Sequence, residues 1–165
     1  MTYSWNSEKY PQVNESELLT LFAEIKKLTL PDIPEEYGAH FIFVEDDEMV
    51  ELNWQCLEHE GTTDVITFDY FNDDDDFFDE DSALEVIICL DFAKREGDER
   101  NDSSYAEELV LYIVHSMLHS AGFDDLCEED RLEMRQQEAR VMNALKRDGK
   151  LSQFNKVFPE PKMES

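Results

Sequence analysis

No apolar segment of this 165-residue sequence approaches the roughly 20 residues that a membrane-spanning helix needs. The first residues, 1–5, contain neither the basic region nor the apolar stretch of a secretory signal peptide. The three cysteines, Cys56, Cys89 and Cys127, are too few and too scattered for a disulfide framework. These absences predict a cytoplasmic protein without a membrane partner.

Basic residues are also scarce. Only 14 Lys and Arg stand against 41 Asp and Glu, which gives a formal net charge of −27. Mutual repulsion between such chains favours solubility. It also excludes nucleic-acid binding through bulk electrostatics, because phosphate contacts require Lys and Arg. Any RNA contact would have to depend on a few local basic residues.

The remaining composition predicts one folded domain, since 41% of the residues are hydrophobic and 12% are aromatic. Periodicity predicts an α+β fold in which a small mixed β-sheet packs against several helices. We expect the domain to cover residues 1–150 and the tail, 151–165, to be poorly ordered. The segment 72–81 is expected to be a solvated acidic loop, because it lacks the glycine and ligand spacing of a calcium site. Strands are expected at 40–45, 62–70 and 83–91, the last two antiparallel, and helices at 16–28, 47–57, 91–97, 105–121 and 128–147.

The helix predicted at 105–121 is apolar on most sides, which indicates a central, buried helix. Ser104 and Glu107 form a capping box at its start, and Gly122 is its stop signal. The helix predicted at 47–57 is expected to turn four apolar residues inward, Met49, Val50, Leu52 and Leu57. The apolar positions of the helix predicted at 128–147 are Leu132, Met134, Ala139, Met142 and Leu145.

The buried helix carries two histidines, His115 and His119, four residues apart, so both imidazoles lie on one face near its end. This spacing is that of zinc-binding H-E-x-x-H helices, although Ser116 replaces the glutamate that serves as general base there. The chain then turns at Gly122 and brings Asp125 towards the same point. Two histidines and a carboxylate with an open position predict a catalytic zinc site.

The segment 114–125, VHSMLHSAGFDD, resembles the signature H-G-x-L-H-L-x-G-Y-D-H of the YbeY family, the bacterial rRNA maturation endoribonucleases. Leu52-Asn53 followed by TDVITF at 63–68 resembles the family's second motif, L-N…T-D-V-L-S-F. LEVII at 84–88 is similar to the third, G-D-I-x-I. The resemblance extends over about residues 15–147, in the same order and spacing.

The resemblance implies a small metal-dependent hydrolase, usually a zinc protein, that cleaves single-stranded RNA in the cytoplasm. It implies a role in 16S rRNA maturation and ribosome quality control, with the 16S rRNA precursor and the ribosome or its proteins as partners. His115, His119 and Asp125 fall on the three ligand positions. The expected mechanism is hydrolysis of an RNA phosphodiester by metal-activated water.

The sequence departs from the family pattern at several positions. Asp125 replaces the usual third histidine, and Leu57 stands where an arginine is usual. His59, two residues further on, and Asp124 are candidates for proton transfer. Asp64 either caps a turn or orients a ligand histidine. The basic residues expected beside the site are Lys94, Arg95 and Arg100.

Two alternatives remain open at this point. A non-enzymatic, ribosome-associated module would hold a structural zinc with four protein ligands, Cys127 being the fourth. Two histidines and one carboxylate are also the ligand set of a non-haem iron oxygenase.

Overall fold

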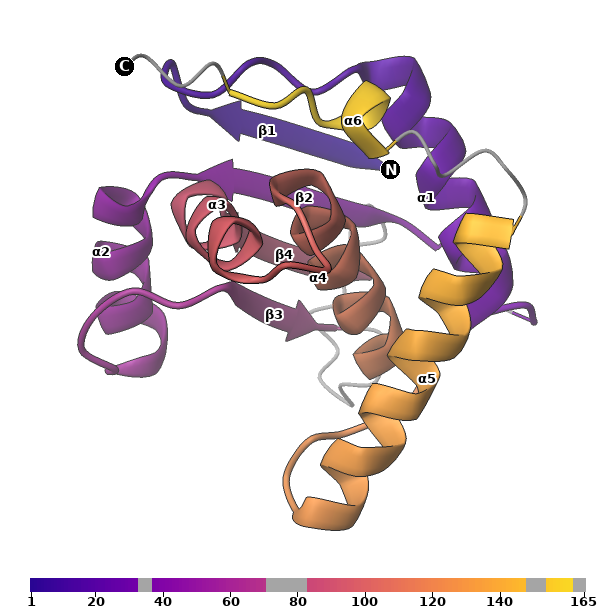
Figure 1. Cartoon of the computed structure of the whole chain (residues 1–165). Helices are drawn as coiled ribbons and strands as arrows, with labels where there is room; N and C mark the ends of the chain where they lie inside the picture. The colour runs from indigo at the N-terminus through magenta and orange to yellow at the C-terminus, as the bar shows by residue number, and fades with distance from the viewer. Residues whose placement is uncertain (33–36, 71–82, 148–153, 162–165) are drawn as a thin grey trace.

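The computed structural model describes residues 1–32, 37–70, 83–147 and 154–161 and contains one mixed β-sheet of four strands (Figure 1). The strands are β1 (Thr2–Asn6), β2 (Ala39–Val44), β3 (Val65–Asp69) and β4 (Leu84–Cys89). Their spatial order is β1-β2-β4-β3, with β1, β2 and β4 parallel. β3 pairs antiparallel with β4, Val65 lying opposite Ile88. The predicted α+β fold with a mixed sheet is confirmed.

The helices begin and end close to the positions that the sequence predicts. Asn14 caps the first helix by accepting a hydrogen bond from the Glu17 N–H, and Ser104 caps the fourth by accepting one from the Glu107 N–H. Gly122 adopts φ +104°, a left-handed conformation that ends the fourth helix. The helices are α1 (Glu15–Thr29), α2 (Asp46–Leu57), α3 (Leu90–Glu99), α4 (Tyr105–Ser120), α5 (Glu128–Arg147) and α6 (Phe154–Val157).

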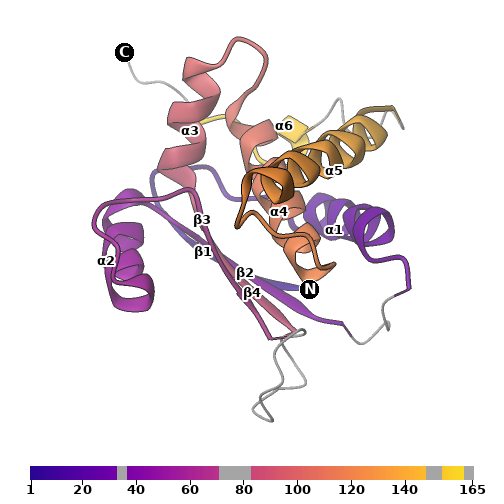
Figure 2. The same cartoon turned by 90° about the horizontal axis from the view of Figure 1, so that it is seen from below.

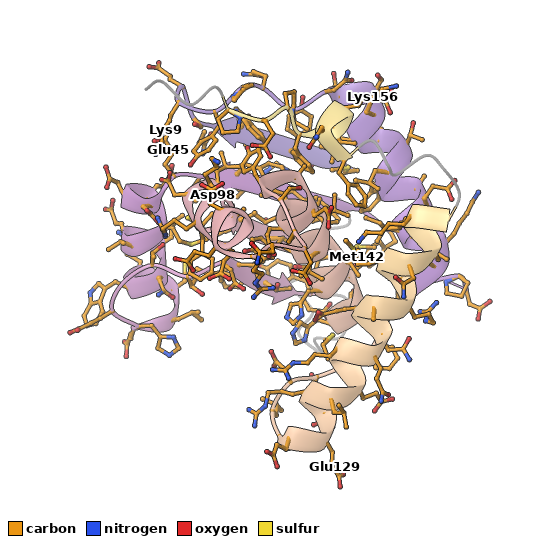
Figure 3. All side chains as sticks on the ribbon, viewed as in Figure 1. Lys9, Glu45, Asp98, Glu129, Met142 and Lys156 are labelled. Atoms are coloured by element: carbon orange, nitrogen blue, oxygen red, sulfur yellow. The ribbon has the colours of Figure 1, made fainter. Side chains whose placement is uncertain are left out.

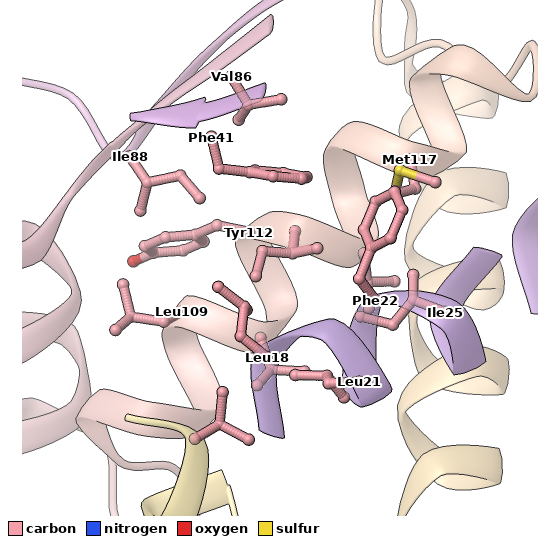
Figure 4. Close-up of a cluster of buried hydrophobic side chains, with 14 of the residues drawn as sticks. Leu18, Leu21, Phe22, Ile25, Phe41, Val86, Ile88, Leu109, Tyr112 and Met117 are labelled. Atoms are coloured by element: carbon pink, nitrogen blue, oxygen red, sulfur yellow. The ribbon is translucent and has the colours of Figure 1, made fainter. Parts of the chain in front are cut away.

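The sheet is covered unequally on its two sides. α1, α4 and α5 lie on one side, and α2 lies on the other (Figure 2). α4 is buried along most of its surface, as predicted, because it packs between the sheet and α1. The larger core contains, among others, Phe41, Val86 and Ile88 of the sheet, Leu109, Tyr112 and Met117 of α4, and Leu18, Leu21, Phe22 and Ile25 of α1 (Figure 4). The smaller cluster on the α2 side contains Val44, Met49, Ile66, Ile87 and Cys89.

Several predicted core positions are wrong. Val50 and Leu57 of α2 are each 42% exposed, because only one face of this helix meets the sheet. Among the apolar positions of α5, Leu132 is 59% exposed, since the first turns of this helix project away from the sheet (Figure 1). Ala139 is also exposed, because Met134, Val141 and Leu145 form the buried face of α5. Figure 3 shows Glu129 at this free end.

The C-terminal segment is more ordered than expected. Phe154, Val157 and Phe158 are buried, and the Val157 carbonyl accepts a hydrogen bond of 2.9 Å from the Asn14 N–H. The expectation of a poorly ordered tail therefore fails for residues 154–161, because apolar side chains at helical spacing fill the space beside α1 and α4. The acidic loop 72–81 and residues 148–153 and 162–165 lie outside the described residues. Among the described helices, none combines the length and the apolar character needed to cross a bilayer.

Candidate metal centre

The last turns of α4 bring the two predicted histidines together. The Nε2 atoms of His115 and His119 are 3.1 Å apart, and their rings lie nearly perpendicular, at 82°. Because Gly122 turns the chain back, the Asp125 Oδ2 atom lies 3.9 Å from the His115 Nε2 and 3.8 Å from the His119 Nε2. Donor atoms of all three residues lie within 4.8 Å of one another. The structure therefore assembles the three residues that the sequence singles out.

This donor set has the size and chemistry of a transition-metal site. Ligands about 2.0–2.1 Å from a tetrahedral zinc ion lie about 3.3 Å from one another. The observed separations of 3.1 to 3.9 Å bracket that value. Within the described part of the chain, no fourth residue joins the group, and Cys127 is exposed and outside it. Three donors leave a position open, which is the pattern of catalytic rather than structural sites.

The open position faces a cavity of about 470 Å³. The cavity lies beside β3, and Leu57 at the end of α2 forms part of its wall. No Lys or Arg is among its described lining residues, so the histidines and any bound cation are its only source of positive charge. These lining residues are Leu57, Asp64, Val65, Ile66, Thr67, Asp69, His115, His119, Asp124 and Asp125.

Glu138 of α5 fixes the orientation of His115. The His115 Nδ1–H donates a hydrogen bond of 2.8 Å to the Glu138 carboxylate, which leaves the Nε2 lone pair directed towards His119 and Asp125. Burial alone would lower the pKa of His115, but the hydrogen bond to Glu138 and the nearby carboxylates raise it above its usual value. A carboxylate on the far nitrogen is the usual second partner of a metal-binding histidine. Sequence reasoning missed Glu138, because it is one of many charged residues on an exposed helix.

His119 has a different environment. Burial, followed by the neighbouring His115, lowers its pKa, so its neutral form is favoured. The Asp124 Oδ1 atom lies 3.9 Å from the His119 Nδ1, too far for a direct hydrogen bond. Asp124 is 59% exposed on its side chain and lines the cavity. A histidine must be neutral to bind a metal ion, so the lowered pKa suits His119 to the role of a ligand.

Of the other two predicted site residues, Asp64 lies at the cavity and His59 does not. Asp64 lines the cavity, but its carboxylate accepts hydrogen bonds from the Val65 N–H and the Thr63 hydroxyl, as a turn cap does. His59 is exposed beyond the end of α2, and its backbone N–H donates to the Asn53 carbonyl. The structure does not bring His59 to the cavity.

The predicted basic residues are already paired. Lys94 pairs with Asp98, Arg95 pairs with Asp46, and Arg100 pairs with two glutamates. In contrast, Arg131 and Arg135, one turn apart on the free end of α5, have no ion pair among the described residues. They line a hollow of about 430 Å³ together with Leu132, Glu128 and Glu129. Sequence reasoning missed this pair, which begins six residues after Asp125.

The family model and the curated relatives agree on one family, and a solved structure shares the fold. The family model described as endoribonuclease YbeY matches residues 3–146. A protein named endoribonuclease YbeY from Azobacteroides pseudotrichonymphae genomovar. CFP2 is 31% identical over 144 residues, which are 87% of this chain and 96% of the relative. Its namesake from Campylobacter jejuni subsp. jejuni serotype O:23/36 (strain 81-176) is 38% identical over 63% of this chain and 72% of the relative. A solution structure of a Thermotoga maritima protein has the same fold, with a TM-score of 0.62 and 21% identity over 98% of this chain and 100% of that one.

Proposed function

This chain belongs to the YbeY family of endoribonucleases, and we propose that it hydrolyses single-stranded RNA with one Zn²⁺ held by His115, His119 and Asp125. The observation that carries the proposal is the convergence of these three donors on an open cavity. By analogy with the family, the proposed natural substrate is the 16S rRNA precursor in the cytoplasm, and the proposed partner is the ribosome with its proteins.

A bound zinc ion would polarise a phosphoryl oxygen and lower the pKa of a water molecule. The protein residues have separate tasks around it. His115 and His119 present neutral nitrogens, and Glu138 holds His115 in the tautomer that frees its Nε2 atom. We assign proton acceptance from the attacking water to Asp124, because its exposed carboxylate lines the cavity and is not part of the donor group. Leu57 supplies an apolar wall and no charge for the phosphate.

Arg131 and Arg135 are the residues that we propose contact the RNA backbone outside the cavity. Their guanidinium groups have no ion pair among the described residues, and they lie on α5, which begins three residues after Asp125. Each phosphate contact that is lost should reduce the slope of log K against log salt by about 0.7 for a single strand. The double variant Arg131→Ala/Arg135→Ala should therefore bind single-stranded RNA less tightly and with a shallower slope. An unchanged slope would remove both arginines from the RNA path.

The decisive experiment measures cleavage of single-stranded RNA, and of the same RNA in a duplex, by the purified protein after zinc addition. His115→Ala and a chelator-treated sample should each lose the activity, and the chelated sample should regain it with zinc. A matched control is His40→Ala, since His40 lies on β2 outside the cavity lining. Cleavage that survives both His115→Ala and chelation would refute the proposal.

A further inference from the structure

A second cavity, of about 360 Å³, adjoins the first on the other side of His115. The two cavities share Asp64, Val65 and His115 in their walls. A ligand in the second cavity would therefore lie directly beside the metal centre. This cavity is also lined by residues of α3 and its C-cap, of α4 and of α5, namely Phe92, Glu96, Arg100, Glu108, Leu111, Tyr112 and Glu138.

The second cavity contains a buried carboxylate, that of Glu108, which is 2% exposed. Its Oε1 atom accepts a hydrogen bond of 2.9 Å from the Ser103 hydroxyl and lies 3.5 Å from the Arg100 Nη1 atom. Neither contact uses the Oε2 atom. Arg100 also pairs with Glu96 at 3.1 Å, so the one Lys or Arg among the described lining residues is shared between two carboxylates.

Tyr112, one turn after Glu108 on α4, adds a buried hydroxyl that interacts with the Glu108 carboxylate only weakly. The residue is 5% exposed and lines the cavity, and its hydroxyl makes no hydrogen bond of ordinary geometry within the described residues. Its ring lies near Phe41, Ile88 and Leu109, with the hydroxyl pointing away from α1 (Figure 4). Burial, followed by the charge of Glu108 and a weak side-chain hydrogen bond to it, raises the pKa of Tyr112, so the group stays a protonated donor. Buried polar groups usually have a partner of good geometry, and a ligand atom would provide one here.

The chemistry of the lining excludes two kinds of ligand. A phosphate would meet Asp64, Glu96, Glu108 and Glu138, and the single arginine is already paired. A tightly bound metal ion would need several convergent donors, and the described residues contain no such group besides the one at His115. What remains is a small ligand with apolar faces and N–H donors on its edge.

We propose that this cavity binds the base of the nucleotide next to the scissile phosphodiester and prefers bases with an exocyclic amino group to uracil. Carboxylates accept hydrogen bonds from the amino group of cytosine, and adenine and guanine present comparable N–H donors. Val65, Phe92 and Leu111 offer apolar and aromatic surface to the base, as single-strand binding sites do. The cavity volume is at the lower end of the range for small-ligand sites. The inference rests on the proposed RNA hydrolysis.

The test uses RNA oligomers that differ only at the nucleotides flanking the cleavage site, each set in turn to A, C, G or U. For the wild type, we expect kcat/KM to be roughly tenfold higher with the preferred amino-bearing base than with uracil. Glu108→Gln should reduce this ratio to about two or below, because the amide oxygen would keep the contacts with Ser103 and Arg100 and the NH2 group, a donor, would replace the accepting Oε2 atom. Tyr112→Phe keeps the ring and provides a second variant if Glu108→Gln does not fold. Glu133→Gln, on the exposed face of α5, is the matched control.

A second readout does not depend on cleavage. Binding of cytidine and uridine to the metal-free protein is followed by NMR, for the wild type and the same variants. A preference for cytidine in the wild type that is weaker in Glu108→Gln supports the base site. If RNA is not cleaved in that case, only the proposed function fails. If the protein cleaves RNA but neither readout shows a base preference, the base site is wrong and the proposed nuclease function stands. If the protein neither cleaves RNA nor binds cytidine, both the base site and the proposed function are wrong.

Discussion

Removal of the Glu138 carboxylate should weaken metal binding without removing a ligand. Glu138 lies on α5, and its Oε1 atom accepts the His115 Nδ1–H at 2.8 Å. In Glu138→Ala, the His115 ring loses its only described partner on that nitrogen and can rotate or adopt the other tautomer. Either change turns the Nε2 lone pair away from the metal position.

The size of the effect follows from two opposing contributions. Loss of a hydrogen-bonded carboxylate behind a ligand histidine typically costs 10–100-fold in metal affinity. Against this, Glu138 raises the pKa of His115, so its removal lowers that pKa and reduces proton competition for the nitrogen. Proton competition matters only near or below the histidine pKa, which is about 6.5 in model peptides. We therefore expect the full loss at about pH 8 and a smaller loss at about pH 6.

The assay is a zinc titration of metal-free protein against a chelator of known affinity, at both pH values. Glu138→Gln should lie between the wild type and Glu138→Ala, because the amide oxygen still accepts the hydrogen bond but carries no charge. Glu133→Ala, exposed on the same helix, controls for the general loss of one negative charge. Equal zinc affinity for the wild type and Glu138→Ala at about pH 8 would refute the argument, since tautomer control by Glu138 would then be unnecessary.

Three further predictions concern stability. Gly97→Ala should lower the free energy of unfolding by about 1–3 kcal/mol in urea titrations, because the new Cβ would lie 2.4 Å from the backbone nitrogen of Tyr105 at the start of α4. An unchanged free energy of unfolding would show that the contact between α3 and α4 can relax. Phe158→Ala should cost about 3–5 kcal/mol in the same assay, since the ring is fully buried, and a loss below about 1 kcal/mol would contradict the packing of the C-terminal segment. Burial opposes ionisation of Asp91, but hydrogen bonds from Lys9 and Tyr10 outweigh it and lower its pKa. This stabilisation is present above the unfolded-state pKa of about 3.9 and is lost as the pH falls through the folded-state pKa. In Asp91→Asn, the free energy of unfolding, measured by urea titration at several acidic pH values, should therefore fall less steeply with decreasing pH than in the wild type.

Local signals in the sequence predicted the helix that carries the site. α4 has a capping serine, an apolar surface on most sides and a glycine at its end, and each of these acts within a few residues. The same local geometry places His115 and His119 on one face and returns Asp125 to them. A site built on one helix end and the turn after it is therefore visible before the fold is known.

Features that depend on contacts distant in sequence were not predicted. β1 pairs with β2 some 38 positions later, and no turn signal links them. Glu138 reaches His115 only because α5 packs along α4. The exposure of Val50 and Leu132 likewise depends on how much of each helix meets a neighbour, which periodicity alone does not specify.

The unequal covering of the sheet divides the protein into regions of different local stability. α2 packs over a small cluster of buried side chains, whereas α4 lies within the main core. Segments with few buried apolar contacts open at lower free energy than the global unfolding, so backbone amides of α2 should exchange with solvent well before those of α4. Leu57 ends α2 and lines the cavity beside His115, His119 and Asp125. Each local opening of α2 would widen the entrance for a bulky RNA strand while the three donor residues keep their positions.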